Sequence, residues 1–263
     1  MKNNVEIPFS GSDITKMFAH EVVDLLKNNK VSAEELVDAA VERICDVEPS
    51  VNAVPTVCVD RARKHAQDIG KMEAGKRGQL QGLPITIKDL TPVAGVTTTY
   101  GTTGLSEFVP AKSSSLVRRM EENGGVVVGK SNTPEFGAGG NTFNAVFGST
   151  KNPWDVTRNA GGSSGGAAAS LATGEVWLAH GSDFAGSLRT PAAYCGIVGL
   201  RPSPGLVPCD ANSLGFQTDA VQGPMARSVR DCALFLDTMV GFDRGAPISF
   251  KGAAQNYQDV VVR

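Results

Sequence analysis

Three short segments of the chain carry side chains that could together perform acyl transfer. The first is Gly161–Gly166, which reads GGSSGG, and the second, Gly181–Ala192, contains Ser187. The third is Gly82–Asp89, a largely apolar run with Lys88 near its end. A serine hydroxyl becomes a nucleophile when a base accepts its proton, and a lysine that loses solvation can act as that base. These residue types therefore indicate serine-based cleavage of an acyl bond.

Each segment also has a non-catalytic interpretation. Gly161–Gly166 has the composition of a flexible linker, but the helix-forming run Ala167–Ala172 follows it. Glycines that lead into a helix place backbone N–H groups and the positive end of the helix dipole near a bound group. The second segment could be a surface turn in which Asp183 and Arg189 form an incidental ion pair. A lone lysine such as Lys88 is usually solvated at the surface.

A histidine is the usual base for a serine nucleophile, and the chain contains only His20, His65 and His180. The first two fall on predicted amphipathic helices far from the glycine-rich segments, which is typical of surface or packed histidines. His180 lies seven residues before Ser187, at a predicted strand end, and remains an alternative base. No histidine has an obvious triad setting, so Lys88 is the better candidate.

The elements that must position these segments alternate between helix and strand. Helices are predicted at 13–26, 32–44, 59–74, 113–123, 165–172 and 228–240, and strands at 83–87, 126–128, 176–179 and 197–200. Ser32 and Glu35 have the spacing of a capping box. The alternation predicts an α/β fold with a central mixed, largely parallel sheet flanked by helices. We expect one domain over 1–263, with an N-terminal helical segment at 1–75 and the sheet core with its catalytic segments at 80–241.

Charge and composition argue against several other classes of protein. The net charge is −2 and there is no run of lysine or arginine, so we expect no nucleic-acid partner and no membrane partner. No apolar run approaches the roughly 20 residues of a membrane span, and Met1–Ser10 lacks the apolar core of a signal peptide. The five cysteines are irregularly spaced without a CxxC pair, which predicts reduced thiols in a cytoplasmic protein, with no metal and no cofactor.

Taken together and in order, the three segments resemble the amidase signature family. That family combines a strand-end lysine, a GGSSGG motif and a serine in the pattern G-S-D-x-x-G-S-x-R-x-P-A. Here Ser163 and Ser187 are 24 residues apart, which fits the family. Further similar segments lie at Ser32–Asn52, Gly129–Phe136, Lys151–Asp155, Gly199–Pro202 and Gly223–Ser228. The resemblance runs from about residue 13 to about residue 243, and the ordered set is far more specific than any single motif.

The resemblance implies the fold of that family and a Ser–Ser–Lys mechanism for hydrolysis of a small-molecule amide. By motif position, Ser187 attacks the amide carbonyl and Ser163 passes the proton of Ser187 onward. Lys88, uncharged when it acts, accepts this proton and returns it to the leaving amine through Ser163. Water then hydrolyses the acyl-enzyme. The resemblance also implies a cis peptide bond between Gly162 and Ser163.

The same resemblance implies where the negative charge of the transition state is held. Backbone N–H groups around Phe184, Ala185, Gly186 and Ser187 would form an oxyanion hole, and one such donor is worth about 2.7–4 kcal/mol. The implied supporting residues are Ser164, Asp183 and Arg189. Ala185 stands where many members have glycine, and a methyl group there requires a negative φ.

The chain departs from the family in length, because members typically continue for a further stretch that completes the sheet and much of the acyl pocket. The three catalytic positions are nevertheless all present. We therefore expect an amidase that acts alone, as a homodimer or with a complementing chain, and we keep an inactive truncated remnant as an alternative.

Two other functions remain open. Gly124–Ser131 satisfies G-x-x-x-x-G-K-S, the pattern of a phosphate-binding loop, although Val126–Val128 inside it is strand-like. The amidase subunit of a tRNA-dependent amidotransferase has the same chemistry but delivers ammonia to a partner enzyme. Those subunits usually carry M-D-E-F where this chain has Thr133–Phe136, which favours a stand-alone amidase.

Overall fold

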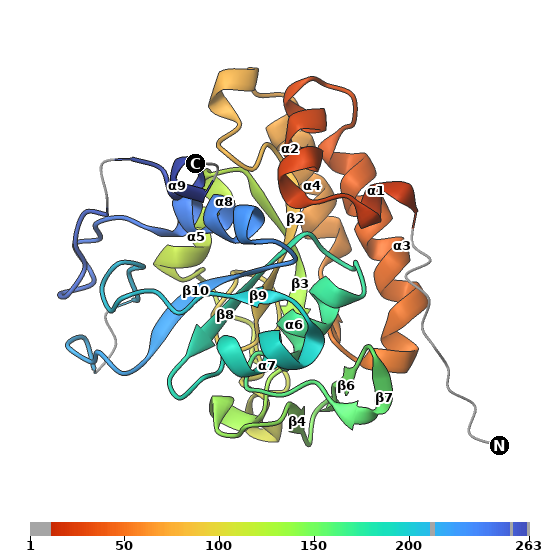
Figure 1. Cartoon of the computed structure of the whole chain (residues 1–263), viewed down its shortest axis with the longest axis vertical. Coiled ribbons are helices and arrows are strands. Elements are labelled where there is room, and N and C mark those ends of the chain that lie inside the picture. Colours follow the sequence, from red (N-terminus) through yellow and green to blue (C-terminus); the bar gives the residue numbers. More distant parts are fainter. Residues whose placement is uncertain (1–11, 211–213, 253–254, 262–263) are drawn as a thin grey trace.

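A six-stranded sheet forms the centre of the computed structural model, which describes residues 12–210, 214–252 and 255–261. The strand order is β1-β3-β2-β8-β10-β9 (Figure 1). The strands are β1 (Thr56–Val57), β2 (Leu83–Lys88), β3 (Gly125–Ser131), β8 (Leu178–Asp183), β9 (Val198–Gly199) and β10 (Val221–Ala226). The central strands β3, β2 and β8 are parallel. β1 pairs antiparallel with β3, β10 pairs antiparallel with β8, and β9 pairs antiparallel with β10. The predicted α/β fold with a mixed central sheet is confirmed.

Helices cover both sides of this sheet. The helices are α1 (Asp13–Lys16), α2 (Ala19–Lys27), α3 (Ala33–Val51), α4 (Val59–Gly70), α5 (Ser115–Glu122), α6 (Gly165–Ala172), α7 (Arg189–Cys195), α8 (Val229–Met239) and α9 (Tyr257–Val261), with short 3-10 turns η1 (Ala74–Lys76), η2 (Thr103–Leu105) and η3 (Glu135–Gly137). In Figure 1, α1, α3 and α4 lie to the right of the sheet, α2 lies above it, α5, α8 and α9 lie at its upper left, and α6 and α7 lie below. Helix α6 packs directly against β2, β3, β8 and β10.

Two short hairpins lie outside the main sheet. The first pairs β4 (Phe143–Asn144) with β5 (Gly148–Ser149), and the second pairs β6 (Lys151–Asn152) with β7 (Asp155–Asn159). The chain leaves β7 and enters the glycine-rich segment that begins α6, so the second hairpin leads directly into the candidate site.

Local sequence signals determine several of the element boundaries. The capping box is confirmed: Ser32 Oγ accepts the Glu35 N–H at 3.2 Å, and Glu35 Oε2 accepts the Ser32 N–H at 2.7 Å. Ser114 and Ser228 likewise accept backbone N–H groups at the starts of α5 and α8. Strands β2 and β3 are buried along their whole length, as expected for parallel strands that are covered on both faces.

The N-terminal helix expected from Asp13 is two helices, α1 and α2. At the break, Glu21 Oε2 accepts the Phe18 N–H at 2.8 Å, and the Arg227 guanidinium donates to the Met17 carbonyl. Both backbone groups would take part in the ladder of a continuous helix. A side chain from the far end of the sequence therefore ends this helix.

Several strands differ from the prediction, among them β10, which has no predicted counterpart. Strand β1 lies inside the segment expected to be helical, where it forms the edge of the sheet beside β3. The strand expected at 176–179 instead runs over Leu178–Asp183. Its polar end is held between β2 and β10, so pairing on both sides extends the strand beyond its apolar residues.

The expectations about cysteines, membrane spans and a signal peptide differ in how far the structure bears on them. All five cysteines are free thiols, in agreement with the reduced state expected of them. Among the described helices, none has both the length and the apolar character that a membrane crossing needs. The expected absence of a signal peptide concerns Met1–Ser10, which lies outside the described residues.

Candidate active site

Lys88 is the last residue of β2, at the carboxyl end of the parallel strands. Strands β3 and β8 pair with β2 on its two sides, and the Lys88 side chain is 0% exposed. In open α/β sheets, ligands bind outside the carboxyl ends of the strands. The fold therefore delivers an amine to the edge of the sheet where chemistry is expected.

Three serine hydroxyls surround the amine of Lys88. Its Nζ donates to Ser163 Oγ at 2.7 Å, to Ser164 Oγ at 2.8 Å and to Ser182 Oγ at 3.0 Å. Ser163 and Ser164 come from the glycine-rich segment, and Ser182 comes from β8. Ser182 lies within the G-S-D motif but was not among the predicted site residues.

Burial lowers the pKa of Lys88 to about 7, against an opposing effect of the Asp183 carboxylate. An ammonium group in a low-dielectric site loses its hydration, which favours the uncharged amine. At neutral pH a large fraction of Lys88 therefore carries a free lone pair and can accept a proton from a hydroxyl within hydrogen-bond reach.

The glycine-rich segment is a packed turn between β7 and α6. The peptide bond between Gly162 and Ser163 is cis, as the resemblance implied. A Cβ on Gly162 would lie 2.9 Å from the Asn141 backbone, and one on Gly166 would lie 2.3 Å from the backbone nitrogen of Asn132. These close backbone approaches require glycine, so the segment is not a flexible linker.

Ser187 lies in the turn between β8 and α7, and it is half-buried. Its backbone carbonyl accepts the Ser164 N–H at 3.3 Å, which holds the two serine-bearing loops against each other. In the described part of the chain, no protein group forms a hydrogen bond with the Ser187 hydroxyl. The structure thus brings Lys88, Ser163 and the Ser187 loop to one place and leaves the Ser187 hydroxyl free to meet a substrate.

Asp183 holds the Ser187 loop in shape. Its carboxylate is buried and accepts hydrogen bonds from the backbone N–H groups of Gly186 at 2.9 Å and Leu188 at 3.1 Å. Arg189 Nε donates to it at 3.1 Å and Arg201 Nη1 at 2.8 Å. Burial acts to raise the pKa of Asp183, but these hydrogen bonds outweigh burial and hold the pKa well below its usual range. The carboxylate therefore stays ionised and the loop stays braced.

Arg201 is a second residue that the sequence analysis did not assign to the site. It binds the Asp183 carboxylate, and it also donates to the Asp183 carbonyl at 2.6 Å and to the Asp219 carbonyl at 2.9 Å. The sequence signal for Arg201 was the G-L-R-P motif. The motif alone does not show a role for this arginine, because its partner Asp183 is known only from the fold.

The predicted oxyanion hole needs one correction. The Gly186 N–H donates to Asp183, so it supports the loop instead of facing a substrate, and Gly186 itself has a φ of 109°. Ala185 is not among the residues with positive φ, so its methyl group fits where many members of the resembled family have glycine. The N–H groups of Phe184, Ala185 and Ser187 remain as candidate donors.

Two of the three histidines have a close polar partner, and the third, His65, lies near a carboxylate. His20 Nδ1 lies 2.7 Å from Asp231, and His65 Nδ1 lies 3.8 Å from Glu121. His180, the alternative base, is fully buried, and its Nε2 lies 2.7 Å from Gln222 Oε1. Burial lowers the pKa of His180 to about 3, which makes it a poor base at neutral pH.

The phosphate-binding alternative is wrong. Gly125–Ser131 forms the buried strand β3 instead of a loop before a helix. Lys130, the lysine of the motif, donates to Asp89 Oδ1 at 3.0 Å and to Thr98 Oγ1 at 2.8 Å. Both partners of this ion pair are buried, so Lys130 supports the segment after Lys88 and is not available to a nucleotide.

Lys130→Met should lower the free energy of unfolding by about 3–5 kcal/mol, because the substitution leaves Asp89 buried without its counter-charge. Urea denaturation followed by circular dichroism measures this loss. Lys151→Met is the matched control, because Lys151 is exposed, and it should change the stability by less than about 0.5 kcal/mol. Equal losses in the two variants would contradict a structural role for the buried pair.

Known proteins resemble this chain in sequence and in fold. The profile of the family described as Amidase matches residues 35–259. The acylamidase of Rhodococcus erythropolis is 41% identical over 241 residues, which cover 91% of this chain and 50% of that protein. A glutamyl-tRNA(Gln) amidotransferase subunit from Thermoanaerobacter pseudethanolicus is 39% identical, over 91% of this chain and 49% of that protein.

A solved structure has the same fold over the described region. The crystal structure of a bacterial aryl acylamidase of the amidase signature family superposes with a TM-score of 0.86 and 34% identity, over 93% of this chain and 51% of that one. The chain thus spans about half the length of the relatives it matches. From the family profile, the sequence identity and the shared fold, this chain belongs to the amidase signature family of hydrolases.

Proposed function

We propose that the chain hydrolyses a small-molecule carboxylic amide through an acyl-enzyme on Ser187, with release of ammonia or an amine. The observation that carries this proposal is the hydrogen bond of 2.7 Å between Lys88 Nζ and Ser163 Oγ, formed by a fully buried lysine. A base of this kind is what a serine nucleophile requires when no histidine is in place.

In the proposed reaction, Ser187 Oγ attacks the amide carbonyl carbon as its proton passes to Ser163 Oγ. Ser163 gives its own proton to Lys88 Nζ, which becomes an ammonium group. The negative charge that forms on the carbonyl oxygen is held by the N–H groups of Phe184, Ala185 and Ser187. The proton then returns from Lys88 through Ser163 to the leaving nitrogen as the C–N bond breaks. Water repeats the sequence on the acyl-enzyme and releases the acid.

The remaining site residues support these steps in the proposal. Ser164 and Ser182 hold Lys88 Nζ beside Ser163 through their hydroxyls. Asp183, Arg189 and Arg201 keep the Ser187 loop in the conformation that turns its free N–H groups toward a substrate. Preorganised donors of this kind account for a large share of the rate in acyl transfer.

The amidase subunit of a tRNA-dependent amidotransferase is the second candidate. This candidate is supported by the relative from Thermoanaerobacter pseudethanolicus. That protein is 39% identical to this chain, and the acylamidase is 41% identical to it. The segment Thr133–Phe136, in place of M-D-E-F, favours the stand-alone amidase. An inactive remnant of an amidase is the third candidate, since this chain spans about half the length of the relatives it matches.

A fluorophosphonate probe tests the proposed nucleophile. Intact-protein mass spectrometry should show one phosphonyl adduct, and peptide mapping should place it on Ser187. Incubation with a panel of simple amides, 4-nitroacetanilide among them, should show an acyl adduct at the same residue. A folded protein that takes up no probe would support the inactive remnant.

We further propose that a second polypeptide, either another copy or a complementing chain, covers the face beside the site. This is supported by exposed aromatic side chains on η3, on the Ser187 loop and on α7: Phe136 is 62% exposed, Phe184 61% and Tyr194 52%. Exposed apolar side chains of this size are typical of interaction surfaces when they gather on one face. The labelled fraction should rise with protein concentration if a homodimer completes the site, whereas a constant fraction contradicts the homodimer.

A further inference from the structure

His180 and Gln222 form a pair next to Lys88 that the proposed mechanism does not use. His180 lies in β8 and is fully buried. The backbone N–H of Lys88 faces its Nδ1 at 3.4 Å, and its Nε2 lies 2.7 Å from Gln222 Oε1. The imidazole therefore connects the backbone of the proposed base to a side chain on β10.

The protonation state of His180 determines how the Gln222 amide is turned. Burial lowers the pKa of His180 to about 3, so the ring is neutral and has one donor and one acceptor nitrogen. The Lys88 N–H can only donate, which makes Nδ1 the acceptor and places the ring hydrogen on Nε2. Nε2 then donates to Gln222 Oε1. The amide nitrogen of Gln222 is consequently turned away from His180.

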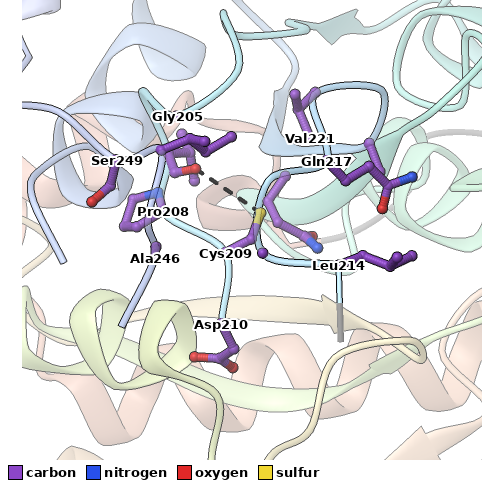
Figure 2. A pocket seen from close by; sticks show the side chains of 14 residues that line it. Gly205, Pro208, Cys209, Asp210, Leu214, Gln217, Val221, Ala246 and Ser249 are labelled. Atoms are coloured by element: carbon purple, nitrogen blue, oxygen red, sulfur yellow. Dashed lines mark hydrogen bonds between the residues drawn. The ribbon is translucent and has the colours of Figure 1, made fainter. Parts of the chain in front are cut away.

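Gln222 is half-buried and lines two adjoining cavities of about 110 Å³ and 270 Å³. The two cavities share Cys209, Asp210 and Gln222, and the smaller one is shown in Figure 2. Leu90 and Tyr100, from the segment after β2, line the larger one. In the part of the chain that the structure describes, Gln222 Nε2 has no protein acceptor. Its two N–H groups are thus available to a molecule in these cavities.

These cavities lie beside the proposed reacting groups. Gln222 is the cross-strand partner of Ser182, and such partners have Cβ atoms about 4.5–5.5 Å apart. Ser182 Oγ accepts a hydrogen bond from Lys88 Nζ. On the other side, Leu90 Cδ1 and Ser163 Oγ lie 2.7 Å and 3.5 Å from the point that a Cβ on Gly137 would occupy. A substrate cleaved at Ser187 can therefore extend toward Gln222.

The charge of the cavity walls limits what they accept. Among the described lining residues there is no lysine or arginine, and Asp210 is the charged one. Asp210 Oδ1 already accepts the Ser115 N–H at 2.8 Å. An anionic group would meet no counter-charge here, whereas a neutral oxygen would meet the Gln222 N–H donors.

We infer that Gln222 is a specificity-determining residue, which binds a neutral acceptor oxygen on the uncleaved part of the substrate, and that His180 is its positioning residue. The substrate class is neutral carboxamides with a second carbonyl group, such as diamides and N-acylamino amides. The inference rests on the proposed amidase function and adds to it the half of the substrate that does not react.

A matched pair of amides tests the inference. N-acetylglycinamide and pentanamide have chains of the same length, but only the first has a second carbonyl oxygen, and ammonia release measures both. The wild type should favour N-acetylglycinamide by about tenfold or more in kcat/KM, the effect of one hydrogen bond in a partly desolvated site. Gln222→Glu keeps the acceptor that faces His180 but replaces the N–H donors with an oxygen, so the ratio should fall at least tenfold.

Gln67→Glu is the matched control. Gln67 is exposed on α4 and lines neither cavity, so the same substitution there adds the same charge away from the His180 pair. Its ratio should equal that of the wild type. His180→Phe should lower the ratio through a higher KM for N-acetylglycinamide, because the Gln222 amide is then free to turn. A merely structural loss would lower the rates on both amides alike and leave the ratio unchanged.

The possible outcomes separate this inference from the proposed function. Equal rates on the two amides in the wild type, or an unchanged ratio in Gln222→Glu, overturn the role of Gln222 and leave the amidase proposal in place. If the wild type hydrolyses neither amide and Ser187 takes up no fluorophosphonate, the proposed function fails and the inference fails with it. If Gln222→Glu does not fold, Gln222→Met removes the same donors, and the same fall in the ratio is required.

Discussion

Ser187→Ala should lower kcat/KM for 4-nitroacetanilide by about 10⁴-fold or more, the scale on which other serine hydrolases lose activity with their nucleophile. The physical reason is that the methyl group cannot form the acyl-enzyme, so the covalent route is closed. The backbone carbonyl of residue 187 still accepts the Ser164 N–H, so the loop should keep its shape. Release of 4-nitroaniline measures the rate.

A control separates the loss of the nucleophile from a loss of fold. Ser170 is a buried serine in α6 whose hydroxyl donates to the Ala167 carbonyl at 3.0 Å. Ser170→Ala should therefore keep activity and fluorophosphonate labelling, whereas Ser187→Ala loses both at an unchanged melting temperature. Wild-type turnover in Ser187→Ala would show that the nucleophile is another residue.

Lys88→Ala should lower kcat/KM at pH 7 by about 10²–10⁴-fold, the usual contribution of a positioned general base. Alanine removes the group that accepts the proton from Ser163 and returns it to the leaving nitrogen. The variant should regain part of its rate as pH rises, because hydroxide then replaces the missing base. An unchanged rate at neutral pH would exclude Lys88 as the base.

The pH dependence gives a sharper form of the same prediction. A base must be unprotonated to act, and the pKa of Lys88 is lowered to about 7. In the wild type, kcat/KM should therefore fall about tenfold per pH unit below 7 and level off above 8. Lys88→Arg keeps a cation that does not lose its proton in this range, so its rate should stay low throughout. If the rate of Lys88→Ala still levelled off above pH 8 as in the wild type, the titrating group would be a different one.

Much of the fold and the core of the site could be predicted from the sequence because the signals are local. The Ser32–Glu35 capping box starts α3 through contacts within four residues, and the valine-rich run of β3 is apolar at consecutive positions. The GGSSGG motif requires glycine because backbones approach it closely, and this requirement is visible in the residue types. The ordered motifs are also specific enough to indicate the family.

Two of the predictions that failed depended on contacts between distant residues, and a third depended on the fold of a single loop. Arg227 ends the first helix through the Met17 carbonyl, and nothing in residues 13–26 signals this. The segment that matches G-x-x-x-x-G-K-S is the buried strand β3, in which Lys130 forms an ion pair with Asp89 from a distant part of the chain. The Gly186 N–H was lost from the oxyanion hole because Asp183 accepts it, which depends on how the loop folds back.

The sequence by itself determined which groups are present: two serines in glycine-rich segments, a lysine at a strand end and no histidine in a triad setting. Only the tertiary structure decided what those groups can do. Lysine in water holds its proton near pH 10.4, and it becomes a base near pH 7 here because β3 and β8 bury Lys88 beside three hydroxyls. The same burial keeps His180 neutral and fixes the direction of the Gln222 amide. Residue identity is a local property, whereas desolvation and hydrogen-bond direction are set by neighbours from distant parts of the chain.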